Sequence, residues 1–179
     1  STKEYIDAVA RLAARYPRIR DLRWRIEHGQ VIRPEDLPRI RDLGMVVSAQ
    51  PHAMADPDKD IGLIGEERRL HAYPYRSILD AGVPLSFGSD VPGEGSYAPL
   101  TAIAHVTDRP GPERISVDEA LEAYTTGSAH AEFAESWKGR LAPGMLADAT
   151  ILKEDPRSSA SIRDITVLGR VLGGSVQWN

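Results

Sequence analysis

The stretch Val83-Pro84-Leu85-Ser86-Phe87-Gly88-Ser89-Asp90 is a short apolar run that ends in a polar turn. Two upstream stretches share this pattern, Arg25-Ile26-Glu27-His28 and Val46-Val47-Ser48-Ala49-Gln50-Pro51-His52. Short apolar runs that alternate with helical patterns are typical of the buried strands of a parallel sheet. Parallel strands end at the same edge of their sheet, so we expect the polar residue that closes each run to lie near the other two.

Helical spacing of apolar residues separates these strands along the chain. Gly44 and Gly82 are suited to end two of the predicted helices, because glycine adopts the left-handed conformation found after many helix C-termini. Ser116 and Glu119 have the spacing of a capping box, which indicates a helix N-terminus. Residues 50–69 are predicted to form a long polar connection. The predicted helices cover residues 2–16, 34–43, 72–81, 100–106, 117–124 and 129–133.

The pattern changes after about residue 134, where short strand-like runs follow one another without helices. We predict strands at residues 147–152, 162–168 and 175–178. A closed barrel of eight strands normally takes about 250 residues, and only three parallel strands are predicted here. The fold class is therefore predicted as α/β, with the C-terminal half of a TIM-type (β/α)8 barrel over residues 1–135 and a small β-sandwich segment over residues 136–179.

Composition limits the function classes that fit this chain. Its 179 residues are 41% hydrophobic and 27% charged, which is typical of a globular domain. The net charge of -4 favours neither nucleic acid nor an anionic membrane as a partner. No apolar run approaches the roughly 18 residues of a membrane span and no signal peptide is visible, so we expect a cytoplasmic protein. The chain begins at Ser1 without a methionine, and we expect it to be a piece of a longer protein.

The polar residues that follow the three strands are His28, His52 and Asp90. Without cysteine, any metal must be bound by nitrogen and oxygen. Two neutral imidazoles and one carboxylate suit a catalytic divalent metal, and the carboxylate can also accept a proton from water. Taken singly, each histidine fits a hydrogen-bonded loop residue and Asp90 fits a turn cap. Their shared position at strand ends favours a metal site.

Six longer motifs occur along the chain. They resemble the amidohydrolase superfamily, in particular the amidohydrolase family 3 branch that includes N-substituted formamide deformylases. The resemblance spans nearly the whole chain, and the set of motifs is specific. The motifs are Arg25-Ile26-Glu27-His28-Gly29-Gln30, Gln50-Pro51-His52-Ala53, Gly65-Glu66-Glu67-Arg68, Ala72-Tyr73-Pro74-Tyr75-Arg76-Ser77-Ile78-Leu79-Asp80-Ala81-Gly82, Phe87-Gly88-Ser89-Asp90-Val91-Pro92 and Lys138-Gly139-Arg140-Leu141-Ala142-Pro143-Gly144-Met145-Leu146-Ala147-Asp148.

This resemblance implies a barrel hydrolase that cleaves non-peptide C–N bonds of small amide-type substrates through metal-activated water, with Zn²⁺ or another divalent metal. It implies that His28 and His52 are metal ligands and that Asp90 is a ligand that also transfers protons. In family members one more residue often separates the Gln-Pro pair from the histidine. The family's first-strand His-x-His pair and its bridging residue have no counterpart in this chain.

Arg76 and Tyr73 are candidate substrate-binding residues, and packing at a helix start is the alternative explanation for both. Because ligands are missing, we expect the 179-residue piece alone to be inactive. The alternative function is a catalytically incomplete module that acts only by association, for example as a homodimer, through exposed sheet edges. A metal-free barrel enzyme is disfavoured, since no paired carboxylates occur at the strand ends.

Overall fold

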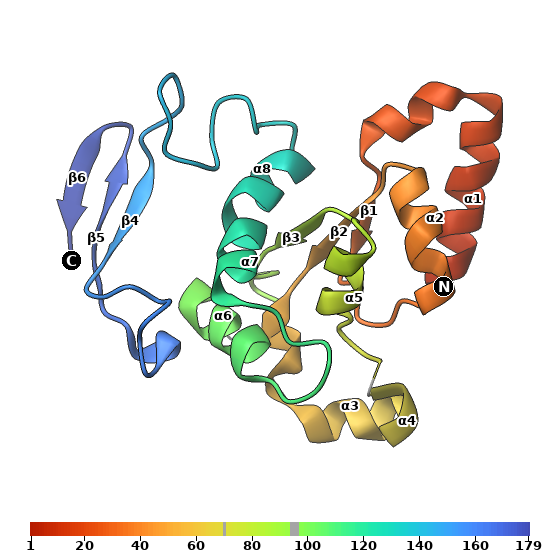
Figure 1. The fold of residues 1–179 in the computed structure, drawn as a ribbon, viewed down its shortest axis with the longest axis horizontal. Helices are drawn as coiled ribbons and strands as arrows, with labels where there is room; N and C mark the ends of the chain where they lie inside the picture. Colours follow the sequence, from red (N-terminus) through yellow and green to blue (C-terminus); the bar gives the residue numbers. More distant parts are fainter. Residues whose placement is uncertain (70, 94–96) are drawn as a thin grey trace.

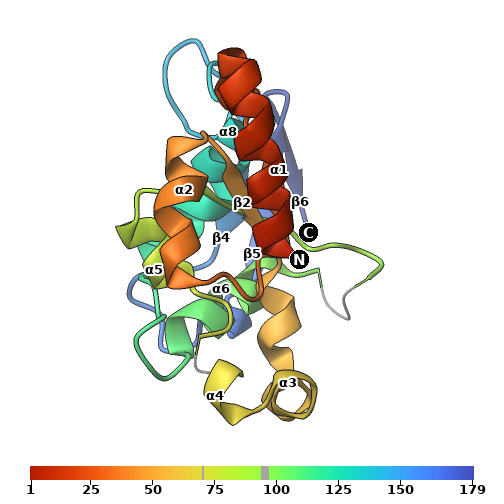
Figure 2. The ribbon, with the colours of Figure 1, turned by 90° about the vertical axis from the view of Figure 1, so that its right-hand side faces the viewer.

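The molecule consists of two small sheets, with helices packed between them and along the outer flank of one sheet (Figure 1). The computed structural model describes residues 1–69, 71–93 and 97–179. Figure 2 shows α1 and α2 side by side, and α6, α7 and α8 separate the two sheets in Figure 1. Within the described ranges, none of the helices has the length and apolar character that a bilayer crossing requires. The α-helices are α1 (Thr2–Arg15), α2 (Leu37–Asp42), α3 (Pro57–Ile64), α4 (Glu66–Arg69), α5 (Tyr75–Asp80), α6 (Pro99–Asp108), α7 (Val117–Glu122) and α8 (Ser128–Ala131).

The first sheet is parallel, as the sequence predicts, and has the order β1 (Arg25–Glu27), β2 (Val46–Ala49), β3 (Leu85–Phe87). Val47 at the centre of the sheet is in register with Ile26 of β1 and with Leu85 of β3. β3 is buried along its whole length and β2 along most of it, which explains their continuous apolar sequences. The carboxyl ends of all three strands consequently lie at one edge.

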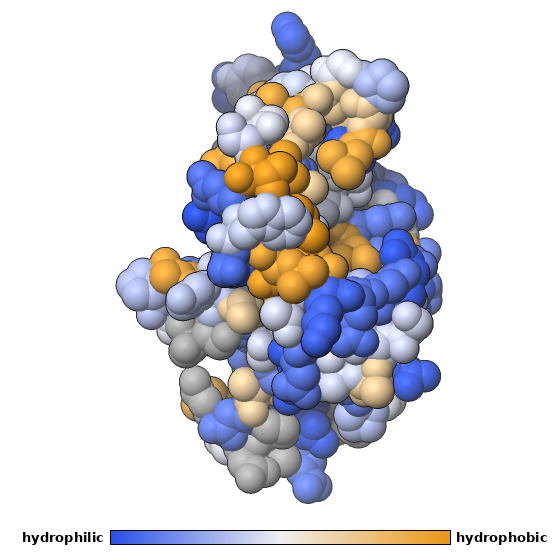
Figure 3. Space-filling view, turned by 90° about the vertical axis from the view of Figure 1, so that its left-hand side faces the viewer, coloured by the Kyte–Doolittle hydropathy of each residue, from blue (hydrophilic) through white to orange (hydrophobic). Residues whose placement is uncertain are grey.

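The second sheet is antiparallel and has the order β4 (Ala149–Leu152), β5 (Val167–Leu172), β6 (Ser175–Trp178). It leaves large apolar side chains in contact with solvent, and apolar atoms gather on the face of the molecule that carries this sheet (Figure 3). Trp178 is 69% exposed and Leu172 is 58% exposed. An apolar surface of this kind is typical of a face that another element covers.

Two sequence predictions of secondary structure are wrong. Residues 50–69, predicted as a polar connection, contain the 3-10 helix Pro51–Ala55 and the helices α3 and α4. Each of these helices is too short to show a clear helical repeat of apolar residues. The strand predicted at residues 162–168 is a 3-10 turn at Ile162–Asp164 followed by β5. Ile162 and Ile165 are buried in the core, so their apolar character reflects packing rather than a strand. The predicted loop 88–97 includes residues 94–96, which lie outside the described residues.

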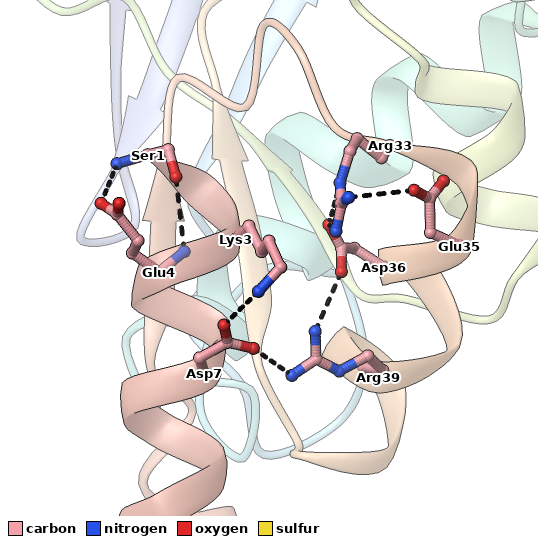
Figure 4. Close-up of polar contacts among 8 residues, drawn as sticks. All are labelled: Ser1, Lys3, Glu4, Asp7, Arg33, Glu35, Asp36 and Arg39. Atoms are coloured by element: carbon pink, nitrogen blue, oxygen red, sulfur yellow. Dashed lines mark hydrogen bonds and ion pairs between the residues drawn. The ribbon is translucent and has the colours of Figure 1, made fainter.

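A group of charged side chains holds α2 against α1 (Figure 4). The Asp36 carboxylate is 2% exposed and accepts hydrogen bonds from Arg33 Nε at 2.8 Å and from Arg39 at 3.0 Å. Arg39 also donates to Oδ1 of Asp7 in α1, at 2.6 Å. Because each buried carboxylate oxygen has a guanidinium partner, the charge of Asp36 is compensated inside the protein.

Acid is expected to destabilise the fold between about pH 4.5 and pH 2. Hydrogen bonds from Lys3 and Arg39 lower the pKa of Asp7 to about 2, and those from Arg76 and Arg23 do the same for Glu119 and Glu135. A carboxyl group whose pKa is lower in the folded state stabilises the fold above its unfolded pKa, and this contribution disappears as pH falls through the folded pKa.

Circular dichroism during an acid titration measures this effect. Arg23→Gln removes the partner of Glu135, so its acid transition should be shallower than that of the unchanged chain. An acid transition that lies entirely above pH 5, or a fold that is equally stable at pH 5 and pH 2, would contradict the prediction.

Candidate metal centre

His28 follows β1 at the carboxyl edge of the parallel sheet. Its backbone N–H donates to the carbonyl oxygen of Ser48 in β2 at 2.8 Å, so the residue stays attached to the sheet. Its φ angle is 65°, in the left-handed region that non-glycine residues seldom adopt. The imidazole is 51% exposed. The backbone is therefore fixed in an unfavourable conformation while the ring remains accessible at the edge of the sheet.

Asp90 occupies the corresponding place after β3. Gly88 N–H donates to the carbonyl oxygen of Ala49 at 3.0 Å, which holds the start of this turn against β2. Asp90 also has a positive φ angle, 54°, and its carbonyl oxygen accepts a hydrogen bond from Gly93 N–H at 2.6 Å. Unfavourable backbone conformations held in place by surrounding structure are frequent at functional sites.

The structure brings the His28 and Asp90 side chains together. Nδ1 of His28 lies 3.9 Å from Oδ2 of Asp90, across the end of β2. This separation is too long for a hydrogen bond. Two donor atoms that share a tetrahedral metal at bond lengths near 2.0–2.1 Å lie about 3.3 Å apart, so a small rotation of either side chain brings the pair to that spacing. The pair therefore fits two neighbouring positions around a divalent metal.

His52 does not join this pair. It lies in the 3-10 helix Pro51–Ala55, is 4% exposed, and packs edge-on against His105 of α6 with 6.3 Å between ring centroids. Among the residues that the structure describes, no three His, Asp or Glu side chains are grouped as a metal site requires. The predicted convergence of all three residues is therefore not met. The 3-10 helix begins one residue after β2, and the ring of His52 packs against His105 of α6 rather than beside His28 and Asp90.

The two candidate substrate-binding residues have different surroundings. Arg76 lies between Asp80, at 3.2 Å, and Glu119 of α7, so carboxylates of the protein already compensate its charge and tie α5 to α7. Tyr73 is buried, and its hydroxyl lies 3.0 Å from the carbonyl oxygen of Ala53 and 3.1 Å from Asp60 Oδ1. These contacts give Arg76 a role in helix packing and place Tyr73 beside a cavity.

Gln50 belongs to the motif Gln50-Pro51-His52-Ala53, but the sequence predicted no role for its side chain. It follows β2, the strand between those that carry His28 and Asp90, and is 8% exposed. Its side-chain amide donates to Ser48 at 3.4 Å, while Oε1 accepts no hydrogen bond from the described residues. A buried amide oxygen without a donor is unfavourable, so Gln50 could accept a hydrogen bond from a bound molecule.

Comparison with known proteins identifies the family of the chain. Residues 1–176 match the amidohydrolase family. The chain is 36% identical to the protein LONG AFTER FAR-RED 3 of Arabidopsis thaliana over 87% of its own length and 28% of the relative's. It is 32% identical to the N-substituted formamide deformylase of Arthrobacter pascens, over 86% of this chain and 30% of that protein.

A solved structure agrees with this match. The crystal structure of a metal-dependent hydrolase from Pyrococcus furiosus is 37% identical, superposes with a TM-score of 0.62, and is matched over 69% of this chain and 26% of that one. The chain thus spans less than a third of the length of each of these three proteins. The family match covers nearly every residue, and it confirms the resemblance inferred from the six motifs. The chain therefore belongs to the amidohydrolase family.

Proposed function

We propose that the intact protein hydrolyses a non-peptide C–N bond of a small amide-type molecule, and that His28 and Asp90 supply two ligands of its metal. The observation that carries this proposal is the 3.9 Å approach of His28 Nδ1 to Asp90 Oδ2 at the carboxyl edge of the parallel sheet. The similarity to a formamide deformylase makes N-substituted formamides the first substrate class to test.

The proposed site requires more chain than these 179 residues. We propose that β1, β2 and β3, within residues 1–135, are part of an eight-stranded barrel, and that residues 136–179 are part of a β-sandwich. Two observations support this proposal. The chain covers 28–30% of its two curated relatives, and the antiparallel sheet leaves Leu172 and Trp178 exposed, as expected of a sheet that another layer covers.

The residues of the site have separable roles. A bound Zn²⁺ or similar ion would polarise the substrate carbonyl and acidify water. The imidazole of His28 and the carboxylate of Asp90 are both about half exposed, so they remain accessible while their backbones are fixed by the sheet. The Asp90 carboxylate can accept a proton from water and return it to the leaving nitrogen. The buried Oε1 of Gln50 could orient the N–H group of the substrate.

Removing the metal from the intact protein is expected to abolish hydrolysis of an N-substituted formamide, and adding Zn²⁺ should restore it. Elemental analysis before and after chelation gives the metal content, and release of formate gives the rate. Full hydrolysis by metal-free protein would contradict the proposal.

The isolated 179-residue chain is the matched control for this experiment. We expect it to hydrolyse nothing, because the described residues provide no group of three metal-binding side chains. The exposed apolar side chains of its antiparallel sheet favour self-association as the alternative behaviour of the isolated chain. Metal-dependent turnover by the isolated chain would show that the site needs no further residues.

A further inference from the structure

A cavity of about 330 Å³ lies next to the 3-10 helix Pro51–Ala55, between α4 and α6. Its apolar wall includes Met54 and Ala104. Its polar wall contains three arginines, one histidine and two carboxylates, namely Arg69, Arg109, Arg163, His105, Asp60 and Asp108. Neither His28 nor Asp90 lines it. The volume is at the lower end of the range for pockets that bind small molecules. The cavity is therefore a candidate binding site separate from the proposed metal ligands.

Two arginines of this cavity have no carboxylate partner among the described side chains. The half-buried Arg109 guanidinium donates only to backbone carbonyl oxygens, of Tyr73 at 2.8 Å and Ala72 at 3.3 Å. Burial lowers the pKa of Arg109, the charge of Glu113 opposes this shift, and the nearby charge of Arg69 adds to it. Nε of Arg69 is buried and has no hydrogen-bond acceptor within the described part of the chain. Two cations thus lie close together, and neither forms an ion pair with a carboxylate among the described side chains.

Elsewhere in the molecule, partly buried arginines are paired with acids. Arg23 binds Glu135, Arg39 binds Asp7 and Asp36, and Arg76 binds Glu119. The acidic residues around the cavity already have other contacts. Asp60 lies within hydrogen-bond distance of the Tyr73 hydroxyl, and Asp108 lies 3.7 Å from Arg163. Among the partly buried arginines of the described chain, only Arg69 and Arg109 therefore lack an ion pair with a carboxylate, and both line this cavity.

We propose that the cavity binds a small organic carboxylate. The planar guanidinium groups of Arg69 and Arg109 match the geometry of a carboxylate and would form charge-assisted hydrogen bonds with it. The apolar wall formed by Met54 and Ala104 favours a ligand with a short hydrocarbon part over an inorganic anion. Burial lowers the pKa of His105, so near neutral pH its ring is an uncharged part of the wall.

Isothermal titration calorimetry on the intact protein tests this proposal with butyrate, with butyramide as its neutral counterpart of nearly equal shape, and with inorganic phosphate. Butyrate is expected to bind at least about tenfold more tightly than butyramide. Arg69→Gln should weaken butyrate binding by about tenfold or more, because it removes charged hydrogen bonds. Arg109 is a poorer test position, since it also holds the backbone at Ala72 and Tyr73.

Arg68→Gln is the matched control, because it removes the same charge from a neighbouring exposed residue that does not line the cavity. It should leave butyrate binding unchanged, and thermal unfolding of each variant without ligand verifies that the fold is retained. The proposal is overturned if butyrate does not bind, if both arginine variants weaken binding equally, or if phosphate binds as tightly as butyrate.

Discussion

Replacement of Asp90 by Asn in the intact protein is expected to lower hydrolysis by about a hundredfold to ten-thousandfold, the range associated with loss of a general acid–base group. Asparagine keeps the shape of the side chain but cannot accept a proton from water or neutralise a cation. The turn itself should persist, because the backbone carbonyl of Asp90 still accepts the hydrogen bond from Gly93. The expected loss is therefore one of catalysis and metal affinity rather than of folding.

His28→Ala is the companion variant, since its imidazole is the other half of the 3.9 Å pair. Both variants should contain less metal than the unchanged protein when all are purified in the same buffer. Asp21→Asn provides a control with the same chemical change at an exposed residue of the 3-10 helix Pro17–Leu22, and should retain full metal content and rate. Unchanged metal and unchanged hydrolysis in both site variants would remove His28 and Asp90 from the proposed mechanism.

Local sequence signals were sufficient to predict the parallel sheet and one helix start. The apolar runs that form β1, β2 and β3 are short and bounded by polar turns, and this pattern predicts buried strands. Ser116 and Glu119 form the predicted capping box, with Ser116 Oγ accepting from Glu119 N–H. Such signals depend only on neighbours in the sequence, which is why they could be read without a structure.

The approach of His28 to Asp90 in the candidate site could be predicted because the ends of their strands determine it. His28 and Asp90 follow directly from their strands, and the rule that parallel strands end at one edge placed them together. The position of His52 could not be predicted in this way, because a 3-10 helix starts between the strand and the histidine. The direction of that helix depends on packing against α6. The presence of Arg69 and Arg109 in one cavity could not be predicted, since the two residues are far apart in sequence and belong to no motif.

Replacement of Gly127 by Ala is expected to lower the stability of the fold strongly, although it adds only one methyl group. Gly127 ends the π-helical turn Ala123–Gly127, and a Cβ atom there would lie 2.2 Å from the carbonyl oxygen of Leu85 in β3. The φ angle of Gly127 is -63°, so the cost comes from the collision rather than from the backbone conformation. The carbonyl group belongs to the main chain and the backbone fixes the position of the Cβ atom, so neither can rotate away. We expect the free energy of unfolding to fall by about 3 kcal/mol or more, at the upper end of overpacking effects.

Gly62→Ala in α3 is the matched control, because it adds the same methyl group to a helical glycine with nothing within 4 Å of the new atom. Alanine is a better helix former than glycine, so this variant should be stabilised by up to about 1 kcal/mol. Urea unfolding of the two variants measures both effects, and equal stabilities would contradict the collision. The two changes in the free energy of unfolding have opposite signs because Gly127 touches the strand that leads to Asp90, whereas Gly62 faces open space. A displaced β3 would therefore also be expected to separate Asp90 from His28, which links the packing of this glycine to the geometry of the proposed metal ligands.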